Sequence, residues 1–312
     1  MYRTTRARIF LKIAFCFVLT LTLLVFGTCS VGSAGELEPI NGGSGPIEQP
    51  VIPEKDFFQG PLKVMTLNIA HGRKTAFSQM FLSWQTIYQN LGDIAGVLKT
   101  TAPDIVALQE ADGPSWWSGD FDHVALLAGK AVYPWHSLAA YMDKWGLQYG
   151  AALLARRPYL ETRACRFAAS WPTPAKGFSM GRFGWFPQGP DKRKPVFVDV
   201  ISVHLDFSRE TIRTRQIDEL RAALAGRKGP QIIMGDFNSR WFTDESVVRT
   251  MNRRSGLQVY RPEASDLGTY GSGRYRYDWI LISADLRFIS YRVMPTLISD
   301  HLAVVAKIGM KP

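Results

Sequence analysis

The residues best suited to chemistry lie in the stretch 231–239, Gln-Ile-Ile-Met-Gly-Asp-Phe-Asn-Ser. An apolar run ends at Gly235, and Asp236 and Asn238 follow two positions apart. In a β-strand this spacing places both side chains on one face. A buried strand that delivers a carboxylate and a carboxamide to its end is typical of a metal or phosphate site, although Asp, Asn and Ser are also common in ordinary turns.

Polar residues occupy the same position in other predicted strands. The apolar stretches 63–67, 105–108 and 196–203 predict strands, and so do 277–282 and 303–308. Six polar residues follow strand ends and three stand at strand starts: Asn68, Glu110, His204, Asp206, Asp236 and Asn238, and then Asp278, Asp300 and His301. In a mixed sheet, antiparallel neighbours bring starts and ends to one rim. Each residue alone has an ordinary explanation as a cap, a turn or a surface group, but together they predict one site.

Helices must alternate with these strands. Apolar residues at helical spacing predict a helix over 83–99, stopped by Pro103, and another over 209–225 with Ser208 as its cap. Asp120 is predicted to cap a shorter helix that extends to Lys130.

The segment 165–195 combines aromatic, basic and proline residues. Its five prolines exclude a long helix. One interpretation is a long surface hairpin whose aromatic side chains fold back on the core. The other is a loop over the active site, which would stack nucleic-acid bases or dip into a lipid surface.

The N-terminal residues 1–34 have the pattern of a secretory signal peptide. A basic start precedes the apolar run Ile13–Phe26, and small residues lead to Ala34, after which cleavage is expected. A retained N-terminal anchor ranks second, with membrane association through residues 9–28, and lipidation of Cys29 ranks third. We therefore expect an exported protein that is secreted, periplasmic or membrane-anchored.

Composition sets the remaining bounds. Residues 35–60, rich in Gly, Pro and Glu, predict a flexible linker, and residues 61–312 predict one domain. The formal net charge of the 312-residue chain is +10. Because four of the basic residues lie in the leader, the domain itself has only a modest basic bias. Outside the leader the only cysteine is Cys165, which excludes an intramolecular disulfide and a cysteine-based zinc site and predicts a packed thiol.

Six short motifs in order resemble the endonuclease/exonuclease/phosphatase superfamily of DNase-I-like phosphoesterases. They are Thr-Leu-Asn, Pro-Asp-Ile-Val-Ala-Leu-Gln-Glu, Ser-Val-His-Leu-Asp, Gly-Asp-Phe-Asn, Tyr-Asp-Trp-Ile and Ser-Asp-His, and they span about residues 61–309. The resemblance implies an α/β fold, a four-layer α/β sandwich in which two packed mixed β-sheets are flanked by helices. It also implies a metal-dependent phosphoric ester hydrolase.

The resemblance implies a metal set and a reaction set. Glu110 and Asn68 would hold Mg²⁺, with Mn²⁺ as the alternative, and Asp300 would add a contact. Hard oxygen ligands suit such ions.

In the reaction set, Asp236 would position or deprotonate the attacking water or assist the leaving group. Asn238 would hold a phosphate oxygen, and His301 would contact the scissile phosphate. Asp278 would orient His301, and His204 would be a second histidine on the phosphate side.

Other polar residues are less closely tied to the motifs. Asp206 and Arg182 are predicted to contact substrate. His71 is left without a role, although its place soon after Asn68 would allow it to reach the site. His123 and His136 are predicted to be structural.

The predicted function is an exported, Mg²⁺-dependent phosphodiesterase. Its first predicted substrate is nucleic acid, because of the basic balance and the aromatic and basic segment 165–195. The first alternative is hydrolysis of phospholipid headgroups, as by a phospholipase C or sphingomyelinase, and the second is a phosphomonoesterase. We expect a monomer. A non-catalytic binding module is disfavoured, because the predicted catalytic residues are all present.

Overall fold

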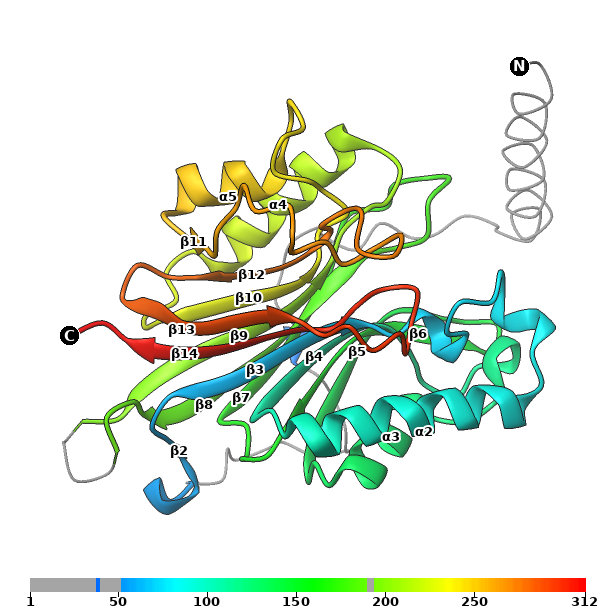
Figure 1. The fold of residues 1–312 in the computed structure, drawn as a ribbon, viewed down its shortest axis with the longest axis horizontal. Coiled ribbons are helices and arrows are strands. Elements are labelled where there is room, and N and C mark those ends of the chain that lie inside the picture. The colour runs from blue at the N-terminus through cyan, green and yellow to red at the C-terminus, as the bar shows by residue number, and fades with distance from the viewer. Residues whose placement is uncertain (1–37, 40–51, 190–193) are drawn as a thin grey trace.

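Two mixed β-sheets form the centre of the molecule (Figure 1). The computed structural model describes residues 38–39, 52–189 and 194–312. Sheet A has the order β1-β7-β8-β9-β10-β12-β11, with β2 paired to β8, and sheet B has the order β13-β14-β3-β4-β6-β5. The strands of sheet A are β1 Glu38–Pro39, β2 Phe58–Gln59, β7 Glu161–Arg166, β8 Gly177–Phe186, β9 Val196–His204, β10 Gln231–Asp236, β11 Gln258–Val259 and β12 Asp278–Ile282. Those of sheet B are β3 Leu62–Asn68, β4 Ile105–Asp112, β5 Trp135–Lys144, β6 Leu147–Ala155, β13 Leu286–Val293 and β14 Val304–Met310.

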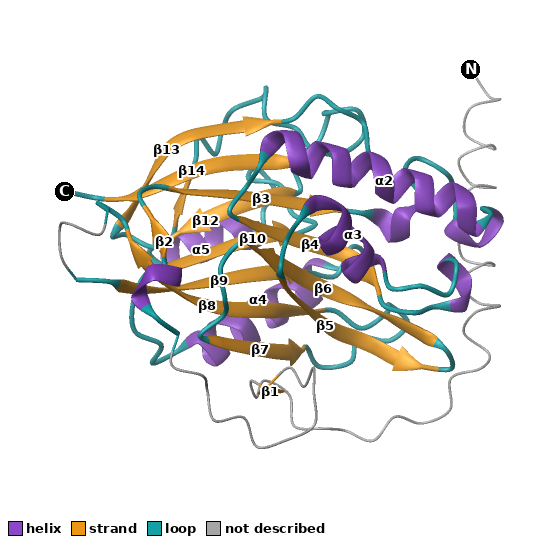
Figure 2. Cartoon of the chain, turned by 90° about the horizontal axis from the view of Figure 1, so that it is seen from below, coloured by secondary structure: helices purple, strands orange, loops and turns teal. Residues whose placement is uncertain are grey.

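Helices cover the outer face of each sheet. The four α-helices of the described residues are α2 Trp84–Thr101, α3 His123–Ala131, α4 Glu210–Leu224 and α5 Val247–Ser255. The short 3₁₀ turns are η1 Glu54–Asp56, η2 Ala70–Gly72, η3 Gln79–Phe81 and η4 Trp116–Ser118. Helices α2 and α3 pack on sheet B, and α4 and α5 pack on sheet A, while the inner faces of the two sheets share a third core (Figure 2). The predicted four-layer α/β sandwich is confirmed.

Two parallel strand pairs give the fold its functional edge. Strand β3 runs parallel to β4, and β9 runs parallel to β10. The antiparallel partner β12 begins beside the end of β10, where Asp278 lies opposite Asp236. The ends of β3, β4, β9 and β10 and the starts of β12 and β14 therefore meet at one rim, as the sequence predicts.

The helices begin and end close to the predicted residues, but two caps differ. Helix α2 has Ser83 as its N-cap, whose side chain accepts a hydrogen bond from the Thr86 amide, and it ends at Ala102 in a left-handed conformation. Helix α3 is capped by Asp122 rather than by Asp120. The N-cap residue of α4 is Arg209, without a side-chain bond, and Ser208 does not cap the helix as predicted. Both shifts fall in polar turns, where neighbouring residues compete for the same position.

The described part of the segment 165–195 forms a hairpin, as one interpretation predicts, but this hairpin lies within a sheet and not on the surface. It begins at the end of β7 and continues through the connection 167–176 into strand β8, which lies inside sheet A between β7 and β9. Phe178, Phe183 and Trp185 are fully buried there, whereas Trp171, in the connection before β8, is 63% exposed. The expectation that the aromatic side chains reach the core is met by those in β8. The run of prolines obscured the strand, because Pro172 and Pro174 lie just before it and Pro187 just after it.

The N-terminal predictions fall mainly outside the described residues. The leader 1–34 lies outside them, as do residues 40–51 of the predicted linker 35–60. The described parts of that linker form β1 and β2, which pair with β7 and β8 and so belong to the fold. Among the described helices, none has the length and apolar character needed to cross a membrane.

Candidate active site

Asp236 is the centre of the polar rim. Its Oδ2 accepts a hydrogen bond from Asn68 Nδ2 at 3.1 Å and lies 3.7 Å from His204 Nε2 and 3.8 Å from His301 Nε2. Its Oδ1 accepts a hydrogen bond from the backbone amide of Asn238 at 2.9 Å. Burial raises the pKa of Asp236 to about 7, and the nearby carboxylate of Asp278 adds to the rise against the opposing effect of His301. A carboxyl group with this pKa can exchange a proton near neutral pH.

The backbone before Asp236 depends on a glycine. Gly235 has a φ of +151° and lies against β9, where an added Cβ would meet the Val203 carbonyl oxygen at 2.0 Å. Only a residue without a Cβ permits this close approach of the two parallel strands. The approach in turn sets Asp236 opposite His204 in the register of β9 and β10.

A bulge in β4 directs Glu110 to the same rim. The pairing of β4 with β6 shifts register between Gln109 and Ala111, and Glu110 takes the left-handed conformation with a φ of +50°. Bulges of this kind bend a strand and turn a side chain toward a site. Burial alone would raise the pKa of Glu110, but the positive charges around it outweigh that effect and lower the pKa, so the group is a carboxylate.

His301 is held as a cation. Its Nδ1 makes a 2.8 Å hydrogen bond with Asp278 Oδ2, and its Nε2 faces Asp236. Burial alone would lower the pKa of His301, but Asp278 and Asp236 outweigh it and raise the pKa to about 10. Asp278 is fully buried, as expected for a residue that orients another group rather than one that contacts solvent.

His204 is neutral, unlike His301, because burial and a neighbouring lysine both disfavour its charged form. Lys176 Nζ lies 3.0 Å from His204 Nε2 and 3.2 Å from Nδ1. Burial, together with the Lys176 ammonium, lowers the pKa of His204 well below its usual value. Burial also lowers the pKa of Lys176, whose side chain comes from the residue just before β8. Lys176 lies in the segment 165–195, for which the sequence leaves a surface hairpin and a loop over the site as alternatives; the structure buries it against His204.

His71 also belongs to the site. Its Nδ1 makes a 2.6 Å hydrogen bond with buried Asp112, and its Nε2 lies 3.5 Å from Glu110 Oε2. The ring packs edge-on against Trp117 and Tyr149. Burial lowers the pKa of His71, but the Asp112 carboxylate outweighs it and raises the pKa above its usual value. The signal in the sequence was the spacing of His71 from Asn68, which alone could not establish the contact.

A cavity of about 670 Å³ opens over these groups. Glu110, His204, Asp236, Asn238 and His301 line it. Other polar and aromatic residues complete the wall: Arg73, Asp300, Arg213, Arg240, Tyr270 and Tyr277. The cavity is large enough for a phosphoryl group and the groups attached to it.

Two predicted residues line the cavity but have partners of their own. Asp300, predicted to contact the metal, forms an ion pair with Arg73 at 2.6 Å. Asn238 has a φ of +48° and donates from Nδ2 to the Leu205 carbonyl at 3.0 Å, which fixes the plane of its amide.

The structure does not bring Asp206 and Arg182 to the cavity wall. Asp206 is buried and its Oδ1 accepts hydrogen bonds from the Ser208 and Arg209 amides, so it orders the entry to α4. Arg182 pairs with Asp199, five positions along β9 from His204, and its side chain lies 3.4 Å from that carboxylate. Of the two histidines predicted to be structural, His123 is buried beside the Ser118 carbonyl, whereas His136 is exposed.

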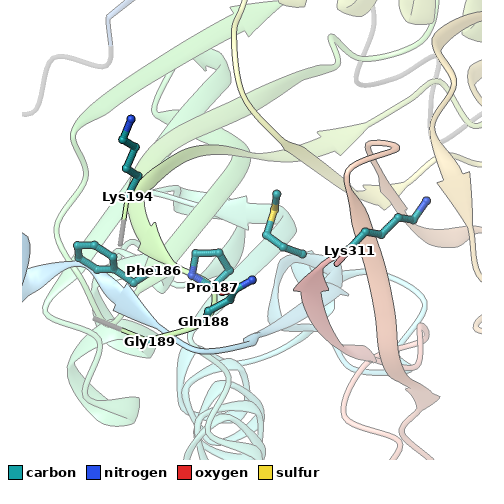
Figure 3. Close-up of a pocket in the computed structure, with 7 residues that line it drawn as sticks. Phe186, Pro187, Gln188, Gly189, Lys194 and Lys311 are labelled. Atoms are coloured by element: carbon teal, nitrogen blue, oxygen red, sulfur yellow. The ribbon is translucent and has the colours of Figure 1, made fainter. Parts of the chain in front are cut away.

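A second cavity lies at the far end of the sheets and lacks such chemistry. It measures about 440 Å³, and its lining includes Phe186, Pro187, Lys194 and Lys311 (Figure 3). Its lining contains neither a carboxylate side chain nor an imidazole.

The oxygen donors at the rim fit a hard divalent cation. Glu110 is ionised and faces the cavity, and the carboxamide of Asn68 lies at the end of β3, the strand next to β4. Asp236, Asp278 and His301 also have ligand atoms within 4.8 Å of one another. The raised pKa of His301 disfavours this second set, because a metal requires the neutral imidazole.

The chain belongs to the endonuclease/exonuclease/phosphatase family, whose sequence model matches residues 65–301. Members of this family are hydrolytic phosphoesterases, typically dependent on a divalent metal, with substrates such as nucleic acids or sugar phosphates. No curated protein matches the sequence.

Solved structures share the fold at low sequence identity. A family protein from Beutenbergia cavernae is 18% identical, with a TM-score of 0.60 over 80% of this chain and 72% of that one. A mannosyl-6-phosphatase of Bacteroides thetaiotaomicron is 17% identical, with a TM-score of 0.60 over 79% and 99% of the two chains. The catalytic domain of human nocturnin, with bound sulfate, is 17% identical, with a TM-score of 0.56 over 82% and 96%. These similarities concern the fold alone.

Proposed function

We propose that the protein is a divalent-metal-dependent phosphodiesterase in which Asp236 is the general base. One observation carries the proposal: a buried carboxyl group with a pKa of about 7 lies within 4 Å of Asn68, His204 and His301 in a cavity that an ionised glutamate also lines. Such a group accepts a proton from water near neutral pH.

Each residue then has a defined task. Asp236 removes the proton from the attacking water, and the His301 cation offsets the negative charge that builds on the phosphoryl oxygens. Asp278 holds His301 in place through Nδ1 and keeps it protonated. Lys176 adds a second positive charge behind His204.

Glu110 and Asn68 are the residues proposed to hold the cation, beside Asp236. When bound, Mg²⁺ or Mn²⁺ would supply positive charge to polarise the phosphoryl group and stabilise the leaving oxygen. Asp300 is the weaker candidate, since Arg73 already neutralises it.

The substrate proposal is broader than the nucleic acid that the sequence favours. The segment 165–195 supports nucleic acid less than its composition suggests, because β8 buries most of its aromatic side chains. The basic net charge is the remaining support for nucleic acid. We keep phosphodiester hydrolysis as the proposal, with export directed by the N-terminal residues 1–34.

The test compares a soluble diester with a soluble monoester. The protein is expected to hydrolyse bis(p-nitrophenyl) phosphate in Mg²⁺ and to lose this activity in a chelator, with slower turnover of p-nitrophenyl phosphate. A preference for the monoester would indicate a phosphomonoesterase instead of the proposed diesterase. The Bacteroides thetaiotaomicron protein of similar fold is named for a phosphatase activity.

A further inference from the structure

Exposed aromatic side chains gather beside the active-site rim. Phe77, Phe81 and Trp84 are 62%, 75% and 55% exposed, and Trp116 is 56% exposed. We define the aromatic patch as these four residues together with Met80 and Trp145, which are also exposed. Side chains of this size rarely stay in water together without a binding role.

Three segments of the chain converge to make the patch. Turn η3, which carries Met80 and Phe81, contacts η4, which begins with Trp116. Trp116 Nε1 donates a hydrogen bond to the Trp145 carbonyl at 3.2 Å in the turn between β5 and β6. The side chain of Trp84, at the start of α2, packs beside Gly119 just after η4. The patch is therefore one surface and not a set of scattered residues.

Hydrogen bonds and short chain segments connect the patch to the active site. Trp117, next to Trp116, donates a 2.9 Å hydrogen bond to Asp112, which in turn binds His71 beside Glu110. Arg73, a wall residue of the cavity, lies four positions before Phe77. Figure 1 shows the segment after β3 and the start of α2 at the end of the molecule toward which β3 runs. A surface that bound the patch would thus adjoin the mouth of the cavity.

The charges around the patch favour a lipid surface over nucleic acid. Lys74 is paired with Asp93 at 3.1 Å, and Arg73 is paired with Asp300 at 2.6 Å. Nucleic-acid binding needs an excess of basic groups along the phosphate backbone, and this balanced rim does not provide one. Phe, Met and Trp without net charge instead suit the apolar boundary of a bilayer, where tryptophan is enriched.

We infer that the aromatic patch is a docking surface for a lipid bilayer, and that it brings membrane phosphodiesters to the cavity. The docking step stands by itself, whereas the lipid substrate rests on the proposed phosphodiesterase. A retained anchor, the second-ranked prediction for the leader with its apolar run Ile13–Phe26, would also hold the domain near a membrane.

The test measures flotation with phosphatidylcholine vesicles. All proteins carry Asp236→Asn, so that binding is separated from hydrolysis. Each is prepared as the full chain and as the chain from Gly35, which retains every described helix and strand without the apolar leader. The triple variant Phe77→Ser/Phe81→Ser/Trp116→Ser is compared with the control Trp135→Ser/Phe197→Ser. The control residues are 44% and 46% exposed, and they lie at the strand ends far from the rim.

The chain from Gly35 is expected to float with vesicles almost equally at low and high salt. The triple variant should lose at least about tenfold in vesicle affinity, and the control should not. Without Asp236→Asn, the triple variant should hydrolyse soluble diester normally but lose hydrolysis of vesicle lipid. Absence of flotation, or equal flotation of the triple variant, overturns the inference. Salt-sensitive binding of single-stranded DNA that the triple variant loses would assign the patch to nucleic acid instead.

Discussion

Two histidines at the rim differ in charge because their buried neighbours differ. Asp278 and Asp236 keep His301 protonated, whereas Lys176 and burial keep His204 neutral. Asp236 lies within 4 Å of both. A cation that faces the substrate and a carboxylate that accepts a proton are thus available at the same pH.

The pH dependence of kcat/KM follows from these pKa values. The rate should rise with pH as Asp236 loses its proton, at or below about pH 7, since a cation bound beside it would lower its pKa further. It should fall again toward pH 10 as His301 becomes neutral. Asp278→Asn removes a charge that raises both pKa values, so the rise and the fall of kcat/KM with pH should both move to lower pH. An unchanged pH profile in that variant would contradict the assignment of the two pKa values to Asp236 and His301.

Lys176 should matter although it is buried. Lys176→Met keeps the bulk of the side chain and removes its charge, so kcat/KM should fall by about 100-fold. The pKa of His204 should rise at the same time, because the ammonium now lowers it. NMR titration of the imidazole measures this directly. The control Lys194→Met changes an exposed lysine at the far end of the sheets and should alter neither quantity. A His204 pKa that does not move would show that the contact has no electrostatic effect.

At the scale of elements, strand ends and one bulge make the site. Gly235 allows β10 to lie close to β9, and the shift in β4 turns Glu110 toward the cavity. The parallel pairs β3 with β4 and β9 with β10 then place their final residues at one rim. The chemistry depends on register, so a change that disturbs a strand can remove activity from a distance.

Sequence reasoning succeeded where local pattern decides position. The strand ends at Asn68 and Asp236 could be recognised from apolar runs that stop at polar residues. Glu110 was also recognised in this way, although it lies in a bulge within β4, which continues to Asp112. Sequence reasoning failed where a long-range contact decides. Strand β8 was hidden by flanking prolines, and the contact of Lys176 with His204 exists only because β8 pairs with β9. The prediction that Arg182 contacts substrate also failed to place this residue in β8. Arg182 lies opposite Asp199, five residues before His204 in β9, and therefore far from the rim.

The buried side chains of β8 should contribute measurably to the free energy of unfolding. Trp185 is fully buried in the core between the sheets, and its Nε1 donates to the Gly60 carbonyl at 2.6 Å. Trp185→Ala should lower the free energy of unfolding by about 3–5 kcal/mol. Trp135→Ala, at a 44% exposed position, should change it by no more than about 0.5 kcal/mol. Urea unfolding measures both, and a small effect for Trp185→Ala would contradict its place in the core.

At the scale of the whole molecule, the polar rim joins two sheets that share an apolar core. Asn68 from sheet B donates to Asp236 from sheet A, and His204 of sheet A faces Glu110 of sheet B. A cation bound by Glu110 and Asn68 of sheet B would lie beside the Asp236 carboxylate of sheet A, and it would so help to hold the two sheets together. Binding to the folded state alone stabilises that state.

Divalent cations should therefore raise the melting temperature. Mg²⁺ at 100 times its dissociation constant adds about 2.7 kcal/mol to the free energy of unfolding, a shift of several degrees. Glu110→Gln should remove most of the shift. Glu210→Gln, which alters another glutamate of the cavity wall, should keep it. A shift that survives Glu110→Gln would place the cation elsewhere.

The central claim is that Asp236 acts as the base in metal-dependent phosphodiester hydrolysis. The most direct test is the rate of Asp236→Asn against that of the unaltered protein, in Mg²⁺ and in chelator. Plasmid DNA, RNA, bis(p-nitrophenyl) phosphate and phospholipid vesicles serve as substrates, with the exposed Asp266→Asn as control. We expect metal-dependent hydrolysis of at least one diester. Asp236→Asn should lower the hydrolysis rate by about 100-fold to 10,000-fold with an unchanged fold, and the control should not lower it. Undiminished hydrolysis by Asp236→Asn, or no metal-dependent hydrolysis of any diester, would contradict this claim.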